Sequence, residues 1–501
     1  MNQNPAMPKD ASAIILVRDG KVLWAQRNPK LKFLGGWHAF PGGKTEKTDA
    51  EIEVKNCEDL QLQKFIVGAV REIFEEVGVL LVRNGDKLTK GQRASLHDDL
   101  ISGRSSFKEI LDHWKLWIDA EDFQYTGFWT TPQFSPVRFK THFFIAECPA
   151  KQTPYAAITE LENIEFILPK DALARWEKSE VLISPPVLIA LQILATENTE
   201  KHREILLGKS QKFDGVIDYI ELNPRLICFP LKTKTLPPAT HTNCFIVGKK
   251  EFVVIDAASP ELEEQAKLFD LIDEFIEKGF ICKEIIVSHL HPDHFGGETA
   301  LQNHLREKFG LEIPISTHKI TAEDLRGKVE FQKFIEDEQV FNLKDELGIS
   351  FEIKALHTPG HARGHLCFYY SELGFLLSSD NVVGTGSVVI ASPEGNMTDY
   401  LQSLERMKNL PNLRFLAGSH GSAIFDAKGK IEEYISHRLE REKQILEAIE
   451  KGAKTPEEIR QIVYEGLDEK LFPLAFKSVL AHLAKIEADK NFASEFQYFT
   501  R

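Results

Sequence analysis

Four potential metal ligands lie close together in the middle of the chain. His289, His291, Asp293 and His294 belong to the run His-Leu-His-Pro-Asp-His, which directly follows a short apolar stretch. Each of these side chains would need a polar partner if it were buried, and Pro292 disfavours a helix in the residues before it. We therefore expect a loop at the end of a strand, where alternate imidazoles can converge on one cation.

Further polar residues follow apolar, β-type runs later and earlier in the chain. His361 lies in a turn after one such run, Asp380 and His420 come after two others, and Asp256 closes the run 252–255. Layered α/β folds gather their sites at strand ends. These residues are therefore expected to lie near the histidine cluster.

The order of these residues resembles the metallo-β-lactamase superfamily over about residues 213–436. The resemblance implies an αββα sandwich, a supporting role for Asp256 behind one ligand, and two bound zinc ions, although manganese or iron would also suit these ligands. The implied ligands form two groups joined by a bridging carboxylate: His289, His291 and His361 for one metal, Asp293, His294 and His420 for the other, and Asp380 between them.

Two adjacent cations would lower the pKa of a shared water toward about 7 and make hydroxide available near neutral pH. Asp293 is also a candidate catalytic residue, because it could orient that water or accept its proton. The expected reaction is the hydrolysis of an ester, a thioester or a phosphodiester.

A second group of carboxylates lies near the N-terminus on a predicted helix. Its apolar positions recur at the spacing of one helical face, at Val70, Ile73, Phe74 and Val77. Three glutamates fall on the opposite face, where they repel one another unless a divalent cation lies among them. They are Glu72, Glu75 and Glu76.

This helix, together with a preceding glycine loop that contains Gly42 and Gly43, resembles the Nudix box. The resemblance implies that the three glutamates bind Mg²⁺ or Mn²⁺, that Glu72 takes part in catalysis, that Arg71 orients the glutamates, and that the site cleaves a diphosphate. Arg71 lies 28 positions after Gly43, twice the 14 of the motif, so an insertion of 14 residues splits it. The first acidic position of the motif then falls on Asp49 counted forward, or on Gln63 counted backward.

The rest of the first 200 residues resembles the coenzyme A diphosphatase branch of that family, which also carries a split box. Arg27, Lys32 and the stretch from Trp129 to Pro132 match parts of its pattern, with Lys32 where arginine is usual. The resemblance implies an α/β/α sandwich over residues 1–200, with Arg27, Gly42 and Gly43 near the substrate.

The last part of the chain, residues 437–501, is expected to be helical. Thr455-Pro456-Glu457-Glu458 is a helix start, with a capping threonine and proline at the first helical position. This block resembles the winged-helix-like end of the β-lactamase-like endoribonucleases, a branch close to glyoxalase-II-like thioesterases. The resemblance assigns Arg438 a role near the substrate or behind the ligands.

Length and composition bound the remaining expectations. A chain of 501 residues is too long for one core, and we expect domains at 1–200, 207–436 and 437–501. No apolar run could span a membrane and no secretory signal is visible, so a cytoplasmic protein with free cysteines is expected. The net charge of −14 offers no broad basic surface to nucleic acid.

The sequence thus predicts an α/β multidomain, metal-dependent hydrolase with two sites that act on small molecules. Nucleotide-linked substrates, coenzyme A and thioesters fit both resemblances. One alternative is a single-stranded RNA endonuclease with a regulatory or inactive Nudix domain. Another is a ligand-binding sensor that uses the Nudix domain, and a homodimer is compatible with every one of these readings.

Overall fold

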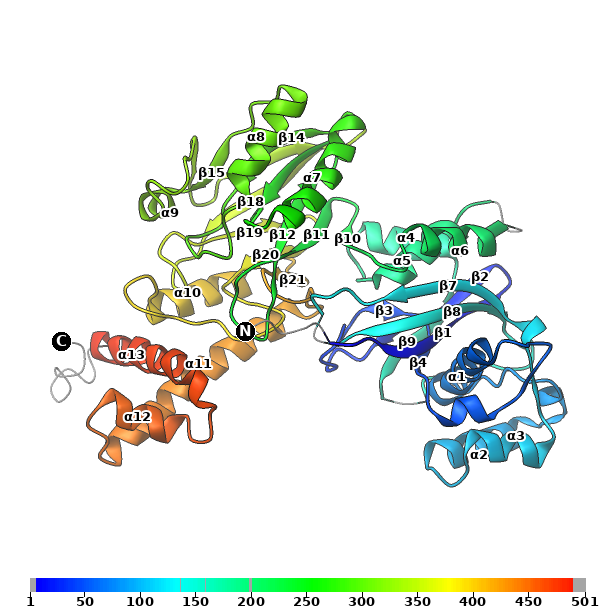
Figure 1. Cartoon of the computed structure of the whole chain (residues 1–501). Helices are drawn as coiled ribbons and strands as arrows, with labels where there is room; N and C mark the ends of the chain where they lie inside the picture. The colour runs from blue at the N-terminus through cyan, green and yellow to red at the C-terminus, as the bar shows by residue number, and fades with distance from the viewer. Residues whose placement is uncertain (1–5, 136, 158, 198–200, 490–501) are drawn as a thin grey trace. The chain divides into compact units, whose positions relative to one another are not determined.

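The computed structural model describes residues 6–489, except 136, 158 and 198–200. The chain forms two compact units, Met1–Asn223 and Pro224–Arg501 (Figure 1). Across the described residues, each helix is too short or too polar to cross a membrane. The six cysteines are all free, and five of them are buried, as the sequence predicted.

The first unit is built on a mixed β-sheet. Its strands are β1 (Lys9–Arg18), β2 (Lys21–Arg27), β3 (His38–Ala39), β4 (Gly42–Lys44), β7 (Gln124–Thr130), β8 (Phe139–Glu147) and β9 (Leu161–Ile167). The order is β3-β2-β1-β8-β7, with β4 paired to β1 and β9 paired to β2. The short strands β5 (Val54–Lys55) and β6 (Ile118–Asp119) pair separately, and β10 (Ile220–Asn223) ends the unit.

Helices cover both faces of this sheet, since successive side chains of a strand point to opposite faces. Ile14 and Leu16 of β1 pack in one core, and Ala13 and Ile15 pack in the other. The first core includes α1 (Leu60–Val77), α2 (Lys90–Ile101) and α3 (Phe107–Trp114). The second includes α4 (Pro169–Glu177), α5 (Pro185–Leu194) and α6 (His202–Lys212), on the other side of the sheet in Figure 1.

Helix α1 carries the glutamates, and its two ends are fixed by local sequence. Asp59 caps its start by accepting hydrogen bonds from the backbone N–H groups of Gln61 and Leu62. Gly78 ends it with a φ of 67°, a left-handed conformation that glycine adopts at little cost. The apolar stripe that includes Ile73 and Val77 is buried against the sheet, which leaves the glutamate face at the other side.

The second unit contains two further sheets. The first runs in the order β11 (Leu226–Lys232), β12 (His241–Gly248), β13 (Glu251–Ile255), β14 (Ile281–Ile286), β15 (Ile315–His318) and β16 (Lys333–Ile335). The second runs in the order β17 (Val340–Lys344), β18 (Ser350–His357), β19 (Leu366–Tyr370), β20 (Phe375–Ser379) and β21 (Phe415–Gly418).

Helices lie on the outer faces of both sheets (Figure 1). The first sheet carries α7 (Leu262–Glu277), α8 (Glu298–Phe309) and the short α9 (Lys319–Asp324), and the second carries α10 (Met397–Lys408) and the first part of α11 (Ala427–Glu450). The layered α/β architecture predicted for both units is confirmed.

The C-terminal helices form a separate small core. Ile445 and Ile449 of α11 pack with Ile459 of α12 (Pro456–Val463) and with α13 (Phe472–Ala488). Thr455 caps α12 in a capping box, as its sequence predicted. Helix α11 begins at Ala427, before the boundary expected at residue 437, because Asp426 caps it there and Ile431 anchors it in the core of the second sheet. One continuous helix therefore joins the two cores.

Candidate metal centre and carboxylate site

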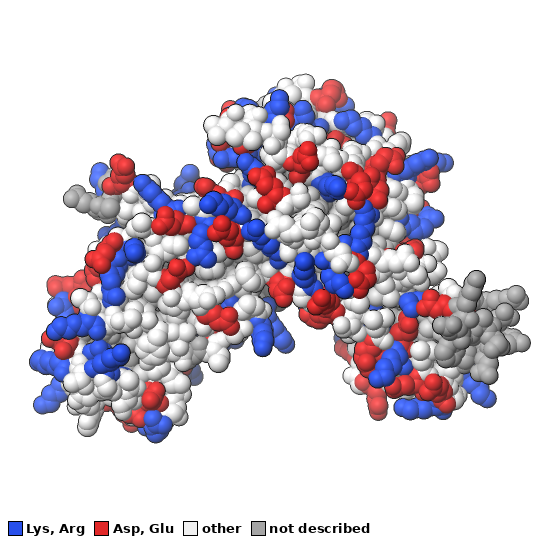
Figure 2. Space-filling view, turned by 180° about the vertical axis from the view of Figure 1, so that it is seen from behind, with Lys and Arg blue, Asp and Glu red and all other residues white. Residues whose placement is uncertain are grey.

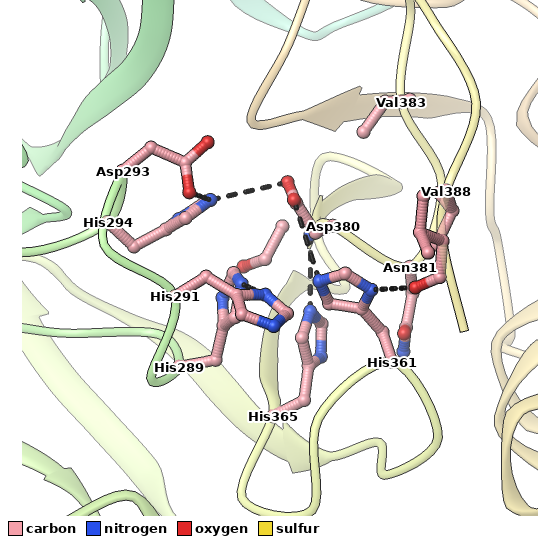
Figure 3. A network of polar contacts seen from close by, with 12 residues as sticks. His289, His291, Asp293, His294, His361, His365, Asp380, Asn381, Val383 and Val388 are labelled. Carbon is pink, nitrogen blue, oxygen red and sulfur yellow. Dashed lines mark hydrogen bonds and ion pairs between the residues drawn. The ribbon is translucent and has the colours of Figure 1, made fainter. Parts of the chain in front are cut away.

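The predicted ligands of the second unit all follow strands, at the carboxyl ends. His289 follows β14, His361 follows β18, Asp380 directly follows β20, and His420 follows β21. The structure brings all seven predicted ligands together, and Figure 3 labels each of them except His420. Three overlapping groups of ligand atoms each lie within 4.8 Å: His289, His291 and His361; His289, His294 and Asp380; and Asp293, His294 and His420.

Asp380 lies between the two predicted metal positions. Its Oδ2 is 3.6 Å from His361 Nε2 on one side. Its Oδ1 is 3.5 Å from His294 Nε2 and 3.4 Å from His420 Nε2 on the other. Each oxygen of this carboxylate thus faces a different group of histidines, which is the arrangement that a bridging ligand requires.

These separations fit a metal centre better than a hydrogen-bond network. They are longer than the usual N–H···O hydrogen bond but close to about 3.3 Å, the ligand–ligand distance of tetrahedral coordination at about 2.0–2.1 Å. The Nε2 atoms of His294 and His361 and the Oδ1 of Asp380 are buried, and within the described residues they have no hydrogen-bond partner. His289 Nε2 and His291 Nδ1 face each other at 3.0 Å, which a cation between them would make favourable.

The other ring nitrogens of these histidines are engaged in a consistent way. The Nδ1–H of His361 donates to Val389 O at 3.0 Å, and that of His420 donates to His241 O at 2.8 Å. A carbonyl can only accept, so both rings carry their proton on Nδ1 and present the lone pair of Nε2. This is the tautomer that binds a metal through Nε2.

Asp256 plays the corresponding part for His294. Its Oδ2 accepts from His294 Nδ1 at 2.8 Å and from the Ser288 hydroxyl at 2.7 Å, and its Oδ1 accepts from the Ser288 backbone N–H at 2.7 Å. Asp256 has a φ of 57°, a left-handed conformation. The sequence-based expectation that Asp256 supports a ligand agrees with these contacts.

The charges of the metal-free cluster are divided between its histidines. Burial lowers the pKa of His361 to about 3 and holds that of His289 well below its usual value, so both rings are neutral. Burial would also lower the pKa of His294, but Asp380 and Asp293 outweigh it and hold that pKa well above the usual range. A cation bound here would therefore replace a proton, and its affinity depends on pH.

Two residues at this centre were not anticipated. His365 is fully buried beneath the ligands, and its Nε2 accepts from the Asp380 backbone N–H at 3.2 Å (Figure 3). Thr235 lies in the loop before β12, and its hydroxyl is 3.3 Å from His420 Nε2. His365 follows His361 by four residues and precedes a strand, which was an available signal, whereas nothing in the local sequence marks Thr235.

The carboxylate site of the first unit is organised by Arg71. Its guanidinium bonds Asp49 through Nε at 2.9 Å and Nη2 at 3.1 Å, and it also bonds Glu72 at 2.9 Å and Glu75 at 3.2 Å. Gln63 instead accepts from the Val54 N–H and donates to Cys57 O, within the inserted segment. Of the two candidates for the first acidic position of the motif, Asp49 is therefore the one that contacts Arg71.

The glycine loop lies against the glutamates, as its sequence suggested. The Gly42 N–H donates to Glu76 Oε2 at 2.8 Å. A side chain at Gly43 would place its Cβ 2.4 Å from Glu72 Oε2, so it would displace the Glu72 carboxylate. Arg27 is also near these glutamates: burial lowers the pKa of its guanidinium, and the negative charge of Glu76 opposes that shift.

Burial and like charge hold protons on two of these glutamates. Burial raises the pKa of Glu72 to about 7, against the opposing effect of Arg71. Burial and the neighbouring Glu72 together raise the pKa of Glu76 to about 8. Crowded carboxylates of this kind are poised for a divalent cation. Among the described residues, however, the three glutamates do not form a group with all ligand atoms within 4.8 Å, and the same Nη1 of Arg71 bonds both Glu72 and Glu75.

Arg438 lies in neither site directly. It is 5% exposed on α11, and its Nη2 donates to Val388 O at 2.6 Å. Its guanidinium lies 5.5 Å from the centre of the Tyr400 ring. Of the two roles expected for Arg438, these contacts favour support of the site over direct contact with a substrate.

Comparisons with known proteins match three parts of the chain. Residues 237–420 match the family described as Metallo-beta-lactamase superfamily, residues 455–492 match the Beta-lactamase associated winged helix domain, and residues 7–184 match the NUDIX domain. These matches confirm the family resemblances and the order of the three parts.

Individual proteins are similar to parts of the chain. The "Lactamase-like protein adaB" of Aspergillus niger is 30% identical over 246 residues, which cover 46% of this chain and 70% of that protein. The "Atrochrysone carboxyl ACP thioesterase" of Claviceps purpurea is 28% identical over 57% of this chain and 86% of that protein. The crystal structure of a NUDIX hydrolase from Alicyclobacillus acidocaldarius is 29% identical, with a TM-score of 0.34, over 40% of this chain and 96% of that one.

Proposed function

Residues 237–420 of this chain belong to the metallo-β-lactamase superfamily and residues 7–184 form a Nudix domain, both of them families of hydrolases, and from this premise we propose a two-site hydrolase. The second unit hydrolyses an acyl thioester, and the first cleaves a diphosphate in a nucleotide-linked compound such as coenzyme A. We also propose that the protein acts in the cytoplasm.

One observation carries the proposal for the second unit. The two oxygens of Asp380 face separate histidine groups at 3.4–3.6 Å. A pair of cations held there would make hydroxide available near neutral pH and polarise the bond under attack. Zinc is the proposed metal, and manganese or iron would also suit the donors.

The chain's own residues would then orient the reactants and move the proton. Asp293 is partly buried, and its carboxylate faces the second group of ligands, with Oδ2 3.5 Å from His420 Nε2 and Oδ1 3.9 Å from His294 Nε2. It would accept a proton as water attacks the thioester carbonyl, and it would return that proton to the leaving thiolate. The net reaction breaks the C–S bond and yields an acid and a thiol.

Two observations favour a thioester over a nucleic acid. One relative of the second unit carries the name thioesterase. Residues 437–489 hold nine Lys and Arg against eleven Asp and Glu, whereas binding a phosphate backbone needs an excess of positive charge. Figure 2 shows charges of both signs interspersed over the visible face of the molecule.

For the first unit, the proposal rests on the buried carboxylates around Arg71 and the adjacent glycine loop. Mg²⁺ or Mn²⁺ is the proposed cofactor, held by glutamate oxygens. Glu72 and Glu76 are the best-placed residues to hold it. Glu76 is buried and Glu72 is partly buried, and burial raises the pKa of both, so a bound cation would replace protons there.

A reciprocal experiment tests both sites in the full chain. Thiol release from acyl-coenzyme A of several chain lengths should be lost in His294→Ala and kept in Glu72→Gln. Cleavage of the diphosphate of coenzyme A, followed as release of its nucleotide half and of phosphopantetheine, should be lost in Glu72→Gln and kept in His294→Ala. Absence of thiol release for every acyl chain would contradict the thioesterase proposal.

A second candidate function rests on the winged-helix match at residues 455–492. In this alternative the second unit cleaves single-stranded RNA and the Nudix domain is regulatory. Cleavage of single-stranded RNA by the wild-type chain, lost in His294→Ala, would favour it. A chain that binds a nucleotide but cleaves no diphosphate would instead indicate that the Nudix domain is a sensor.

A further inference from the structure

Residues 381–389 connect three of the seven predicted ligands. The segment begins directly after Asp380 and has no helix or strand. The backbone N–H groups of Gly384 and Thr385 donate to the carbonyl of His420 at 2.7 and 3.1 Å. At its far end, Val389 O accepts from His361 Nδ1 at 3.0 Å. Figure 3 shows part of this segment, at Val383 and Val388, beside the ligand cluster.

Without regular structure of its own, the segment depends on side chains from two helices. The Tyr400 hydroxyl of α10 donates to Asn381 O at 2.7 Å. The Tyr434 hydroxyl of α11 lies 3.3 Å from Val383 N and 3.2 Å from Val383 O. Val382, Val383 and Val388 also pack in the core of the second sheet, so the segment follows the positions of these two helices.

Arg438 makes the last contact before the Val389 carbonyl. Its Nη2 donates to Val388 O at 2.6 Å. The side chain is buried, and its Nε has no partner among the described residues. A buried guanidinium has a high desolvation cost, so a shorter or uncharged side chain would be expected here if the residue only filled space.

We propose that Arg438 is a positioning residue for the metal centre, which acts by fixing the Val389 carbonyl that orients His361. That carbonyl holds the proton on Nδ1 and so keeps Nε2 free for the metal. When the segment shifts, the ring of His361 loses this orientation and the first metal position loses one of its three histidines. Partners of metal-binding histidines typically contribute 10–100-fold to metal affinity.

Helix α11 also connects Arg438 to the winged-helix core, which is the small core formed by α11, α12 and α13. Toward the C-terminus, Ile445 and Ile449 of the same helix pack in the winged-helix core, and toward the N-terminus Ile431 packs beside the metal-binding sheet. A displacement of the winged-helix core would therefore move Arg438 relative to Val388. This inference builds on the metal centre of the proposed function but is independent of the substrate.

The test measures metal affinity without substrate. Full-length apoprotein is titrated with Zn²⁺ in competition with a chromophoric chelator, and the Co²⁺ form is examined by visible absorption. Arg438→Met keeps an unbranched apolar stem but removes the guanidinium, and it should lower affinity at one of the two metal positions by about 10–100-fold. The Co²⁺ spectrum should lose the contribution of that position.

Arg441→Met is the matched control. Arg441 lies one turn further along α11, and its Nη1 donates to Val463 O within the winged-helix core. This variant should perturb the tail but leave both metal affinities unchanged. If Arg438→Met does not fold, Tyr434→Phe decides the matter, because it removes only the hydroxyl that holds Val383 and should weaken the same metal position.

Two wild-type affinities in a folded Arg438→Met variant would overturn the proposal. An equal loss in Arg441→Met would also overturn it, because the effect would then come from general disturbance of the helix. A chain that binds two metals normally but hydrolyses no thioester would refute the proposed function while leaving this inference intact.

Discussion

Replacement of Asp256 by asparagine should weaken binding of the second metal without unfolding the protein. Asp256 has a φ of 57°, and asparagine adopts this left-handed conformation more readily than most residues. The side chain keeps its shape, so the change acts on hydrogen bonding. Alanine would instead add backbone strain and leave a cavity.

The magnitude follows from the three donors that point at this carboxylate. The Ser288 backbone N–H bonds Oδ1, while the Ser288 hydroxyl and the His294 Nδ1–H share Oδ2. An asparagine that accepts from the backbone N–H turns its NH₂ group toward His294. The ring must then accept on Nδ1 and carry its proton on Nε2, the wrong tautomer for metal binding.

We expect a 10–100-fold loss of affinity at the second metal position, equal to about 1.4–2.7 kcal/mol. Loss of one charge-assisted hydrogen bond should lower the free energy of unfolding by about 1.5–3 kcal/mol. Competitive Zn²⁺ titration measures the first quantity and urea denaturation of the metal-free chain measures the second. Imidazole ¹⁵N NMR reports the tautomer directly. A variant with wild-type affinity at both positions and the proton still on Nδ1 of His294 would refute this reasoning.

Three further predictions concern the other residues of the two sites. Folding raises the pKa of Glu76 from 4.5 to about 8, so the folded metal-free chain loses stability as the pH rises through this range. The increase in melting temperature on addition of Mg²⁺ should therefore be larger at about pH 8 than at about pH 6. It should be absent in Glu76→Gln. Asp49→Ala leaves the buried Arg71 without its main partner and should lower the free energy of unfolding by about 3 kcal/mol. Gln63→Ala should lower it by about 1 kcal/mol, and chemical denaturation measures both. Similar losses in the two variants would refute the assignment of Asp49. A metal on His420 would free the Thr235 hydroxyl to bond the reacting oxygens. Thr235→Val should therefore lower kcat about tenfold, or about 1.4 kcal/mol, with unchanged metal content, and Thr235→Ser should restore it. An unchanged kcat in Thr235→Val would exclude that role.

The ligands of the metal centre were predictable because their chemistry restricts where they can lie. Polar side chains such as His289 and Asp380 directly after apolar strands must find partners, and strand ends of one sheet converge in space. The residue order then separated the two metal positions, and the structure gathers the same seven residues. Asp256 was likewise expected to support a ligand, and in the structure it contacts His294.

The inserted segment of the Nudix box shows what residue counting leaves open. Asp49 and Gln63 were equally spaced choices, counted from opposite sides of the insertion. Only the folded chain distinguishes them, because η1 (Thr48–Glu51) places Asp49 against the guanidinium of Arg71. A short helical turn inside an insertion leaves no periodic pattern in the sequence.

Contacts between distant segments were the least predictable part of the site. His365 touches Asp380 through a backbone N–H, and Thr235 reaches His420 across 185 positions of the sequence. Arg438 was singled out from its motif, but its partner is a carbonyl in a segment without regular structure. Such pairs depend on tertiary packing, and neither residue type nor spacing encodes them.

The metal content of the intact chain tests the central claim most directly. Protein purified without chelators and dialysed should hold about two tightly bound transition-metal ions per chain by plasma mass spectrometry, with Mg²⁺ largely lost from the Nudix site. Asp380→Asn, which removes the charge that faces both histidine groups, should retain far less than the wild type. A folded wild-type chain that binds no metal on addition of Zn²⁺, or an Asp380→Asn variant that still holds two, would contradict the assignment of a two-metal centre.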